Sequence, residues 1–88
     1  PVKFSLYQNY PNPFNPATVI AFDMPKDGFA NLKIYNALGQ EVSTLISGIV
    51  KAGSYQKVFN AKDLPSGIYF YKFVTENFSE VRKMSLIK

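Results

Sequence analysis

Ala30-Asn31-Leu32-Lys33-Ile34-Tyr35 is the stretch that decides the fold, because apolar and polar side chains alternate along it. In an extended strand Ala30, Leu32 and Ile34 would face one way, and the polar residues between them would face the other. This period of two predicts a half-buried β-strand. No window of the chain shows the longer repeat of an amphipathic helix.

Similar short segments continue on both sides of this stretch, separated by clusters of Gly, Pro, Asn and Asp. Regular turn signals between short alternating segments are typical of a β-sandwich. We expect strands over residues 4–8, 18–24, 30–35, 41–46, 54–59, 68–74 and 81–87. The sequence therefore predicts an all-β fold, a seven-stranded antiparallel Ig-like β-sandwich that forms a single domain over residues 1–88.

The alternation also predicts the core. Lys72 marks the solvent side of residues 68–74, which are otherwise apolar and are expected to form a central strand. The side chains expected to be buried are Ile20, Phe22, Leu32, Ile34, Tyr69, Tyr71, Phe73, Met84 and Leu86.

Three connections between strands carry further expectations. Ile49 and Val50 are expected in a loop bracketed by Ser47-Gly48 and Lys51-Ala52-Gly53. The corner over residues 60–67 has room for one helical or 3₁₀ turn over residues 61–64. The turn over residues 25–28 contains Pro25 and Gly28, which are residue types that favour turns.

Tyr10-Pro11-Asn12-Pro13-Phe14-Asn15-Pro16 is the most unusual connection. Each proline fixes its own φ, removes a backbone donor and keeps the preceding residue out of the helical region. The segment is therefore expected to be a stiff, extended loop. Phe14 is too apolar to be left in water, so we expect its ring to close one end of the sandwich. The alternative is an exposed knob that a partner recognises.

Composition excludes several functions. The chain has no cysteine and no histidine, which removes thiol chemistry, the usual general base and the commonest metal ligands. Its ten basic residues are scattered, and only one of them is arginine, so we expect no nucleic-acid partner despite the net charge of +4. We expect no enzyme activity, no cofactor, no metal and no transmembrane segment. Because Pro1 opens the chain, we expect it to be a piece of a longer protein.

Five blocks follow one another along nearly the whole chain, at residues 10–18, 34–42, 52–55, 64–71 and 82–86. Taken in this order, they resemble the type A C-terminal sorting domain carried by cargo of the type IX (Por) secretion system. The same blocks resemble the Ig-like module of the flagellar hook-capping protein, a wider relative.

The resemblance implies a small sandwich at the C-terminus of a secreted protein. Such a domain directs its upstream cargo through the periplasm and across the outer membrane, so the protein would be secreted or held at the cell surface. The implied partners are the outer-membrane translocon and a sortase-like protease that removes the domain. The recognition residues implied by the family's signal blocks, together with the basic end of the chain, are Pro11, Asn12, Pro13, Gly67, Tyr69, Arg82, Lys83 and Lys88.

The residues of the last strand give this expectation a physical basis. Arg82, Lys83 and Lys88 surround the apolar Met84, Leu86 and Ile87 there, so a partner could add a strand to its edge and read its charge. Lysine on an edge strand is also a common protection against aggregation. The alternative function is a structural spacer or an accessory carbohydrate-binding module, in which exposed aromatic faces stack on sugars. The candidates for such a platform are Tyr7, Tyr10, Tyr35 and Tyr55.

Overall fold

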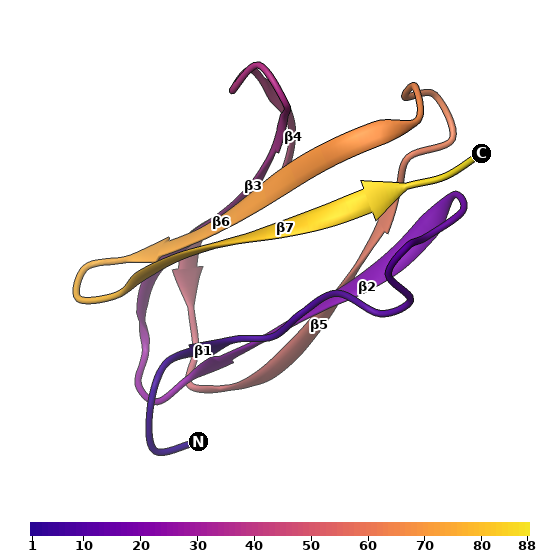
Figure 1. Cartoon of the computed structure of the whole chain (residues 1–88). Coiled ribbons are helices and arrows are strands. Elements are labelled where there is room, and N and C mark those ends of the chain that lie inside the picture. The colour runs from indigo at the N-terminus through magenta and orange to yellow at the C-terminus, as the bar shows by residue number, and fades with distance from the viewer.

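The computed structural model describes residues 1–88, which form two antiparallel β-sheets packed face to face (Figure 1). One sheet has the strand order β1-β2-β5 and the other β4-β3-β6-β7. The predicted all-β sandwich of seven antiparallel strands is therefore confirmed. No helix is present that is long and apolar enough to cross a membrane. The strands are β1 (Ser5–Leu6), β2 (Ala17–Met24), β3 (Gly28–Asn36), β4 (Glu41–Val50), β5 (Gly53–Asn60), β6 (Gly67–Thr75) and β7 (Ser79–Leu86).

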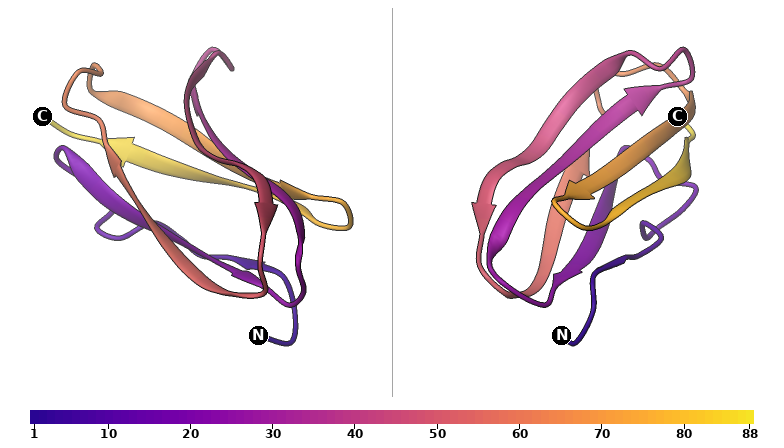
Figure 2. Two further views of the ribbon diagram at one scale, coloured as in Figure 1. Left: turned by 180° about the vertical axis from the view of Figure 1, so that it is seen from behind. Right: turned by 90° about the vertical axis from the view of Figure 1, so that its left-hand side faces the viewer.

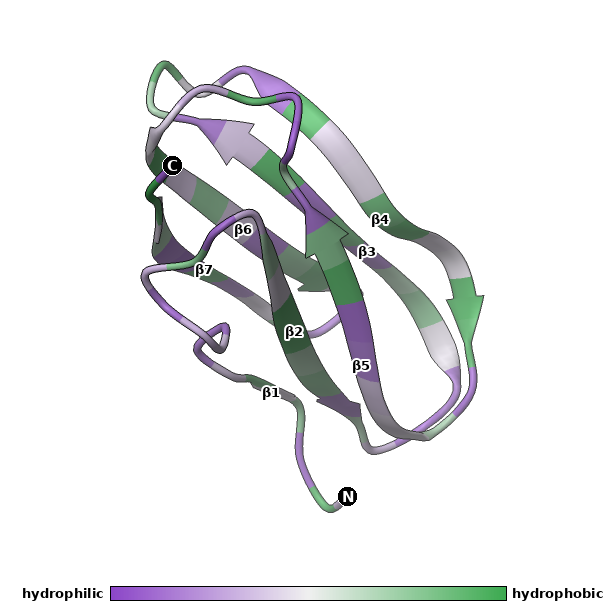
Figure 3. Ribbon diagram, turned by 90° about the vertical axis from the view of Figure 1, so that its right-hand side faces the viewer, coloured by the Kyte–Doolittle hydropathy of each residue, from purple (hydrophilic) through white to green (hydrophobic).

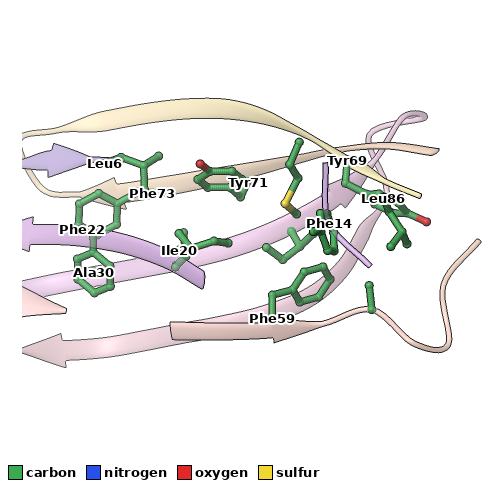
Figure 4. Close-up of a cluster of buried hydrophobic side chains, with 14 of the residues drawn as sticks. Leu6, Phe14, Ile20, Phe22, Ala30, Phe59, Tyr69, Tyr71, Phe73 and Leu86 are labelled. Atoms are coloured by element: carbon green, nitrogen blue, oxygen red, sulfur yellow. The ribbon is translucent and has the colours of Figure 1, made fainter. Parts of the chain in front are cut away.

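The core lies between the two sheets and is made by alternate side chains of each strand (Figure 4). All nine side chains predicted to be inward are buried, which confirms the period-two interpretation. Phe22 of one sheet meets Phe73 of the other with ring centroids 4.7 Å apart. Aromatic pairs of this kind stabilise a thin core because each ring buries a large apolar area.

The strands run between two ends of the sandwich (Figures 1 and 2). At the end we call the C-terminal end lie the finish of β7, the corner over residues 61–66 and the turn over residues 37–40. At the opposite end lie the N-terminus and the turns over residues 25–27, 51–52 and 76–78.

The expectation that Ile49 and Val50 lie in a loop is wrong. Both belong to β4, where Ile49 is opposite Phe29 and Val50 is opposite Gly28. Gly48, which suggested a loop, keeps its place in the ladder opposite Ala30 with a φ of +143°. Glycine adopts this φ without a side-chain clash, so it does not end the strand.

The structure also shows what the corner contains and how long the first strand is. The amide of Leu64 donates to the carbonyl of Ala61 at 3.0 Å, which makes the single turn that the corner was expected to have room for. β1 contains only Ser5 and Leu6, rather than the whole of residues 4–8. Beyond Leu6 the chain makes only isolated backbone pairs with β2, through Tyr7 and Tyr10.

Candidate recognition site at the C-terminal strand

β7 is an edge strand, and the proline-rich loop covers the C-terminal half of its free edge. The amide of Phe14 donates to the carbonyl of Ser85 at 2.9 Å, and the amide of Ile87 donates to the carbonyl of Phe14 at 3.0 Å. Phe14 and Leu86 thereby form an isolated parallel bridge. Residues near the two ends of the chain are thus joined through backbone groups.

The side chain of Phe14 confirms the predicted plug. It is 2% exposed and lies at the C-terminal end of the core, where its ring centroid is 6.2 Å from that of Phe59 (Figure 4). The loop around it is not extended as expected. It bends at residues 11–13 and again at residues 15–16, and the bends bring the Phe14 backbone against β7.

The loop is held in place by its polar groups. The carbonyl of Pro11 accepts hydrogen bonds from Thr18 Oγ1 at 2.9 Å and from Asn9 Nδ2 at 3.2 Å. Asn12 Oδ1 accepts one from the amide of Ser85 at 3.0 Å, which adds a side-chain contact to the backbone bridge. Pro11, Asn12 and Pro13 are all exposed, so their outer surfaces stay available.

The corner over residues 61–66 borders the other side of the β7 terminus. Gly67 begins β6 opposite Leu86, and Tyr69 lies opposite Met84. Tyr69 is buried, and its hydroxyl donates to the carbonyl of Pro65 at 2.6 Å, so it supports the corner from within. The Lys88 ammonium donates to the carbonyl of Lys62 at 2.6 Å.

Arg82 has a different environment from the two lysines predicted with it. Its position in β7 has the same parity as Met84 and Leu86, so its side chain points toward the inner face. Arg82 Nε donates to the Leu6 carbonyl of the other sheet at 2.8 Å, and the guanidinium pairs with Glu80 at 2.9 Å. Arg82 therefore closes the side of the sandwich between β7 and β1.

Lys83 lies on the outer face and is exposed, as is Lys88. The carbonyl of Lys83 accepts a hydrogen bond from Gln8 Nε2 at 2.8 Å. The structure therefore gathers most of the predicted recognition residues around the end of β7, with Arg82 farther along the strand and Tyr69 beneath. We call the exposed members the composite surface: Pro11, Asn12, Pro13, Gly67, Lys83 and Lys88.

Sequence reasoning missed the polar cluster that holds the N-terminal segment against the core. The Tyr71 hydroxyl accepts from the amide of Asn9 at 2.8 Å and donates to the carbonyl of Tyr7 at 2.7 Å. Asn9 is itself buried, and its side chain also donates to Thr18 Oγ1 at 3.0 Å. The only signal in the sequence was an asparagine just before a proline-rich turn, where that residue type often bonds nearby backbone.

Burial raises the pKa of the Tyr71 hydroxyl to about 12. An unfolded tyrosine ionises near pH 10, so between about pH 10 and 12 the unfolded chain has lost a proton that the folded chain keeps. This contribution to stability is therefore complete below about pH 10 and is lost as the pH rises toward about 12.

We expect Tyr71→Phe to remove this alkaline component and to lower stability at neutral pH. The Asn9 amide and the Tyr7 carbonyl would lose their partner, at a cost of about 1–3 kcal/mol. Urea unfolding at several pH values measures both effects. Tyr10→Phe, at an exposed position, is the matched control. A Tyr71→Phe variant with unchanged neutral stability would contradict the role given to this hydroxyl.

The four tyrosines proposed as a sugar platform do not share one surface. Tyr55 lies against the core, with its ring 5.2 Å from that of Phe22 and nearly parallel to it. Tyr35 lies in β3 of the other sheet, opposite Phe70 and Glu41. Tyr7 and Tyr10 are exposed in the N-terminal segment beside β2.

The structure also has a cavity, but it has no metal-binding cluster. At the opposite end of the sandwich, a cavity of about 140 Å³ is lined by residues that include Phe4, Met24 and Asn77. Nowhere do three Asp or Glu side chains gather in a way that could hold a metal ion.

The family model described as the secretion system C-terminal sorting domain matches residues 8–88. This range contains the proline-rich loop, the corner and all of β7, which together make the composite surface. No curated protein and no solved structure matches.

Proposed function

Because the chain belongs to the family of C-terminal sorting domains of the type IX secretion system, we propose that the composite surface is what the secretion machinery recognises. Domains of this family are non-catalytic secretion signals that direct a cargo across the outer membrane. Proteins that carry them are secreted or attached to the cell surface. The type A assignment and the relation to the hook-capping module stay predictions.

One observation carries the proposal, namely the joining of the proline-rich loop to the end of β7. Blocks that are far apart in the sequence form one rigid surface there, fixed by the Phe14 bridge and by the Asn12–Ser85 hydrogen bond. A rigid surface binds with less loss of conformational entropy than a flexible tail would. This surface includes the exposed Lys83 and Lys88, which favour a partner of negative charge.

The geometry also limits how a partner would bind. Because residues 8–14 already occupy the edge of β7 from Lys83 to Ile87, no partner strand can add there without displacing them. We therefore expect side-chain recognition of the composite surface rather than strand addition along the last residues. The proposed partners are the outer-membrane translocon and, for removal of the domain after export, a sortase-like protease. The cargo lies upstream in the same chain.

The proposal predicts that charge reversal at the surface blocks export without unfolding the domain. A fluorescent passenger fused upstream of residue 1 should reach the surface of a bacterium that has the type IX machinery. With Lys83→Glu and Lys88→Glu together, we expect most of the passenger to stay in the periplasm. The readouts are surface labelling of whole cells and the melting temperature of the purified domain.

The matched control is Lys26→Glu with Lys51→Glu, which reverses two exposed lysines at the opposite end of the sandwich. This control should be exported like the parent. Equal export of both double variants would show that charge at the composite surface is not recognised. If the unaltered fusion stayed inside, the sorting function itself would fail for that machinery, and the spacer alternative would be the better explanation.

A further inference from the structure

The two open sheets have four edge strands, and three of them are protected against pairing with another chain. β1 is only two residues long. β7 is covered by residues 8–14 along its C-terminal half and carries Lys83 beside the uncovered part. β5 carries Lys57, which shares the inward parity of Tyr55 and Phe59 yet is exposed. Short edges, covered edges and inward-pointing charges are known protections of natural sheets.

β4 is the fourth edge, and its second half has no such protection. Two register shifts in the β3–β4 pairing, at Leu32/Lys33 and Ile34/Tyr35, make its first half irregular. From Ile46 to Val50 the pairing with β3 is regular. The strand contains no proline, and Glu41 is its only charged residue, so Figure 3 shows it in green and white beyond its start.

The backbone groups on this edge can be assigned from the alternation of an antiparallel ladder. In an antiparallel sheet, the backbone groups of successive residues point to opposite sides of their strand. Those of Ser85 point away from β6, because the Ser85 carbonyl bonds Phe14. The backbone groups of Met84, and of every second residue from it, therefore bond β6. The same alternation can be followed from β7 through β6 and β3 to β4. It shows that the backbone groups of Ile46, Gly48 and Val50 point toward β3. The amides and carbonyls of Ser47 and Ile49 therefore point outward, away from the sheet.

Apolar side chains accompany these free backbone groups. Ile49 is 77% exposed, and Phe29, opposite it on β3, is 37% exposed. A free strand edge beside exposed large apolar side chains is the arrangement that strand addition uses.

We propose that β4 pairs antiparallel with β4 of a second copy of this chain, about a two-fold axis at Gly48. In this register Ser47 bonds Ile49 of the second copy, and Ile49 bonds Ser47 of the second copy. The two Gly48 residues face each other at the axis. This pair at the axis is one that exchanges no hydrogen bonds, where antiparallel backbones come closest, and glycine adds no side chain to crowd it.

The two-fold register favours a second copy at this edge, and local charge does not oppose it. The chain carries a net charge of +4, yet Val42 to Val50 has no charge, so identical strands meet without local repulsion. A two-fold axis also lets one surface serve both partners. The two four-stranded sheets would become one sheet of eight strands. The composite surfaces would stay free, because β7 is the opposite edge of the same sheet.

Sedimentation velocity over a concentration series tests the proposal. One short strand pair buries little surface, so we expect a weak dimer that forms only at high concentration. The mass should rise from 9.9 kDa toward twice that value. In nitrogen–proton NMR spectra of the same samples, the amides of Ser47 and Ile49 should shift with concentration. A chain that stays monomeric at millimolar concentration would overturn the proposal.

Ile49→Lys should abolish this association, because it places two cations at close range across the axis. The matched control is Val58→Lys, which adds the same charge at an exposed valine of the protected edge strand β5. The control should associate like the parent. Association of Ile49→Lys at the parental level, or concentration-dependent shifts confined to β5 or β7, would show that β4 is not the interface.

Discussion

Phe14→Ala is expected to lower the free energy of unfolding by about 3–5 kcal/mol, as other deletions of fully buried rings do. The ring is 2% exposed and fills the C-terminal end of the core beside Phe59. Its backbone is fixed by two hydrogen bonds to β7, so the loop cannot easily move to fill the space left by the ring. Urea unfolding followed by far-ultraviolet circular dichroism measures the change.

Tyr10→Ala is the control for this prediction, because it removes an aromatic ring from the same loop at a position that is 81% exposed. Its effect should stay within about 0.5 kcal/mol, as for most surface substitutions. Two variants of equal stability would mean that the Phe14 ring is not a plug. The alternative of a recognition knob would then gain support.

Removing Met84–Lys88 is expected to have a still larger effect and to leave no cooperatively folded domain. Met84 and Leu86 are almost fully buried, and each such side chain contributes about 2–5 kcal/mol when removed. Their combined loss is comparable to the about 5–15 kcal/mol that stabilises a typical domain. The deletion also removes the partners of Phe14 and Asn12. Poor dispersion in a proton NMR spectrum would report the loss.

Removal of Lys88 alone is the control, since that residue is exposed and lies beyond β7. This shorter deletion should remain folded. A folded domain after the longer deletion would show that β7 is dispensable for the core. If the longer deletion unfolds the domain, then loss of export in that variant reports unfolding rather than lost recognition. The Lys83→Glu, Lys88→Glu double variant tests recognition alone, because it leaves the core intact.

The core could be predicted because its signal is local. Alternation along residues 30–35 and 68–74 depends only on neighbouring side chains, and all nine predicted core positions are buried. The prediction of a loop at Ile49 and Val50 was wrong because Gly48 can either form a turn or continue a strand. Gly48 usually indicates a turn, but here it lies within β4 and continues the strand to Val50.

The candidate site was less predictable because its contacts join distant parts of the chain. Nothing near Phe14 in the sequence indicates that its backbone pairs with Ser85 and Ile87. Arg82 resembles its neighbour Lys83 in charge, yet the parity of β7 turns Arg82 inward to the Leu6 carbonyl. Such roles depend on which strand forms the edge, and sheet order cannot be read from alternation.

The bridge between Phe14 and Leu86 also has a consequence for the order of events during synthesis. β7 and the loop that pairs with it are separated by most of the chain, so this contact closes only after β7 has been made. Contacts of such long sequence separation also form slowly, because a large loop must be ordered first. A chain that is truncated, stalled or still unfolded therefore lacks the joined surface. Because of this bridge, the composite surface is present only on a domain whose last strand has been made and folded.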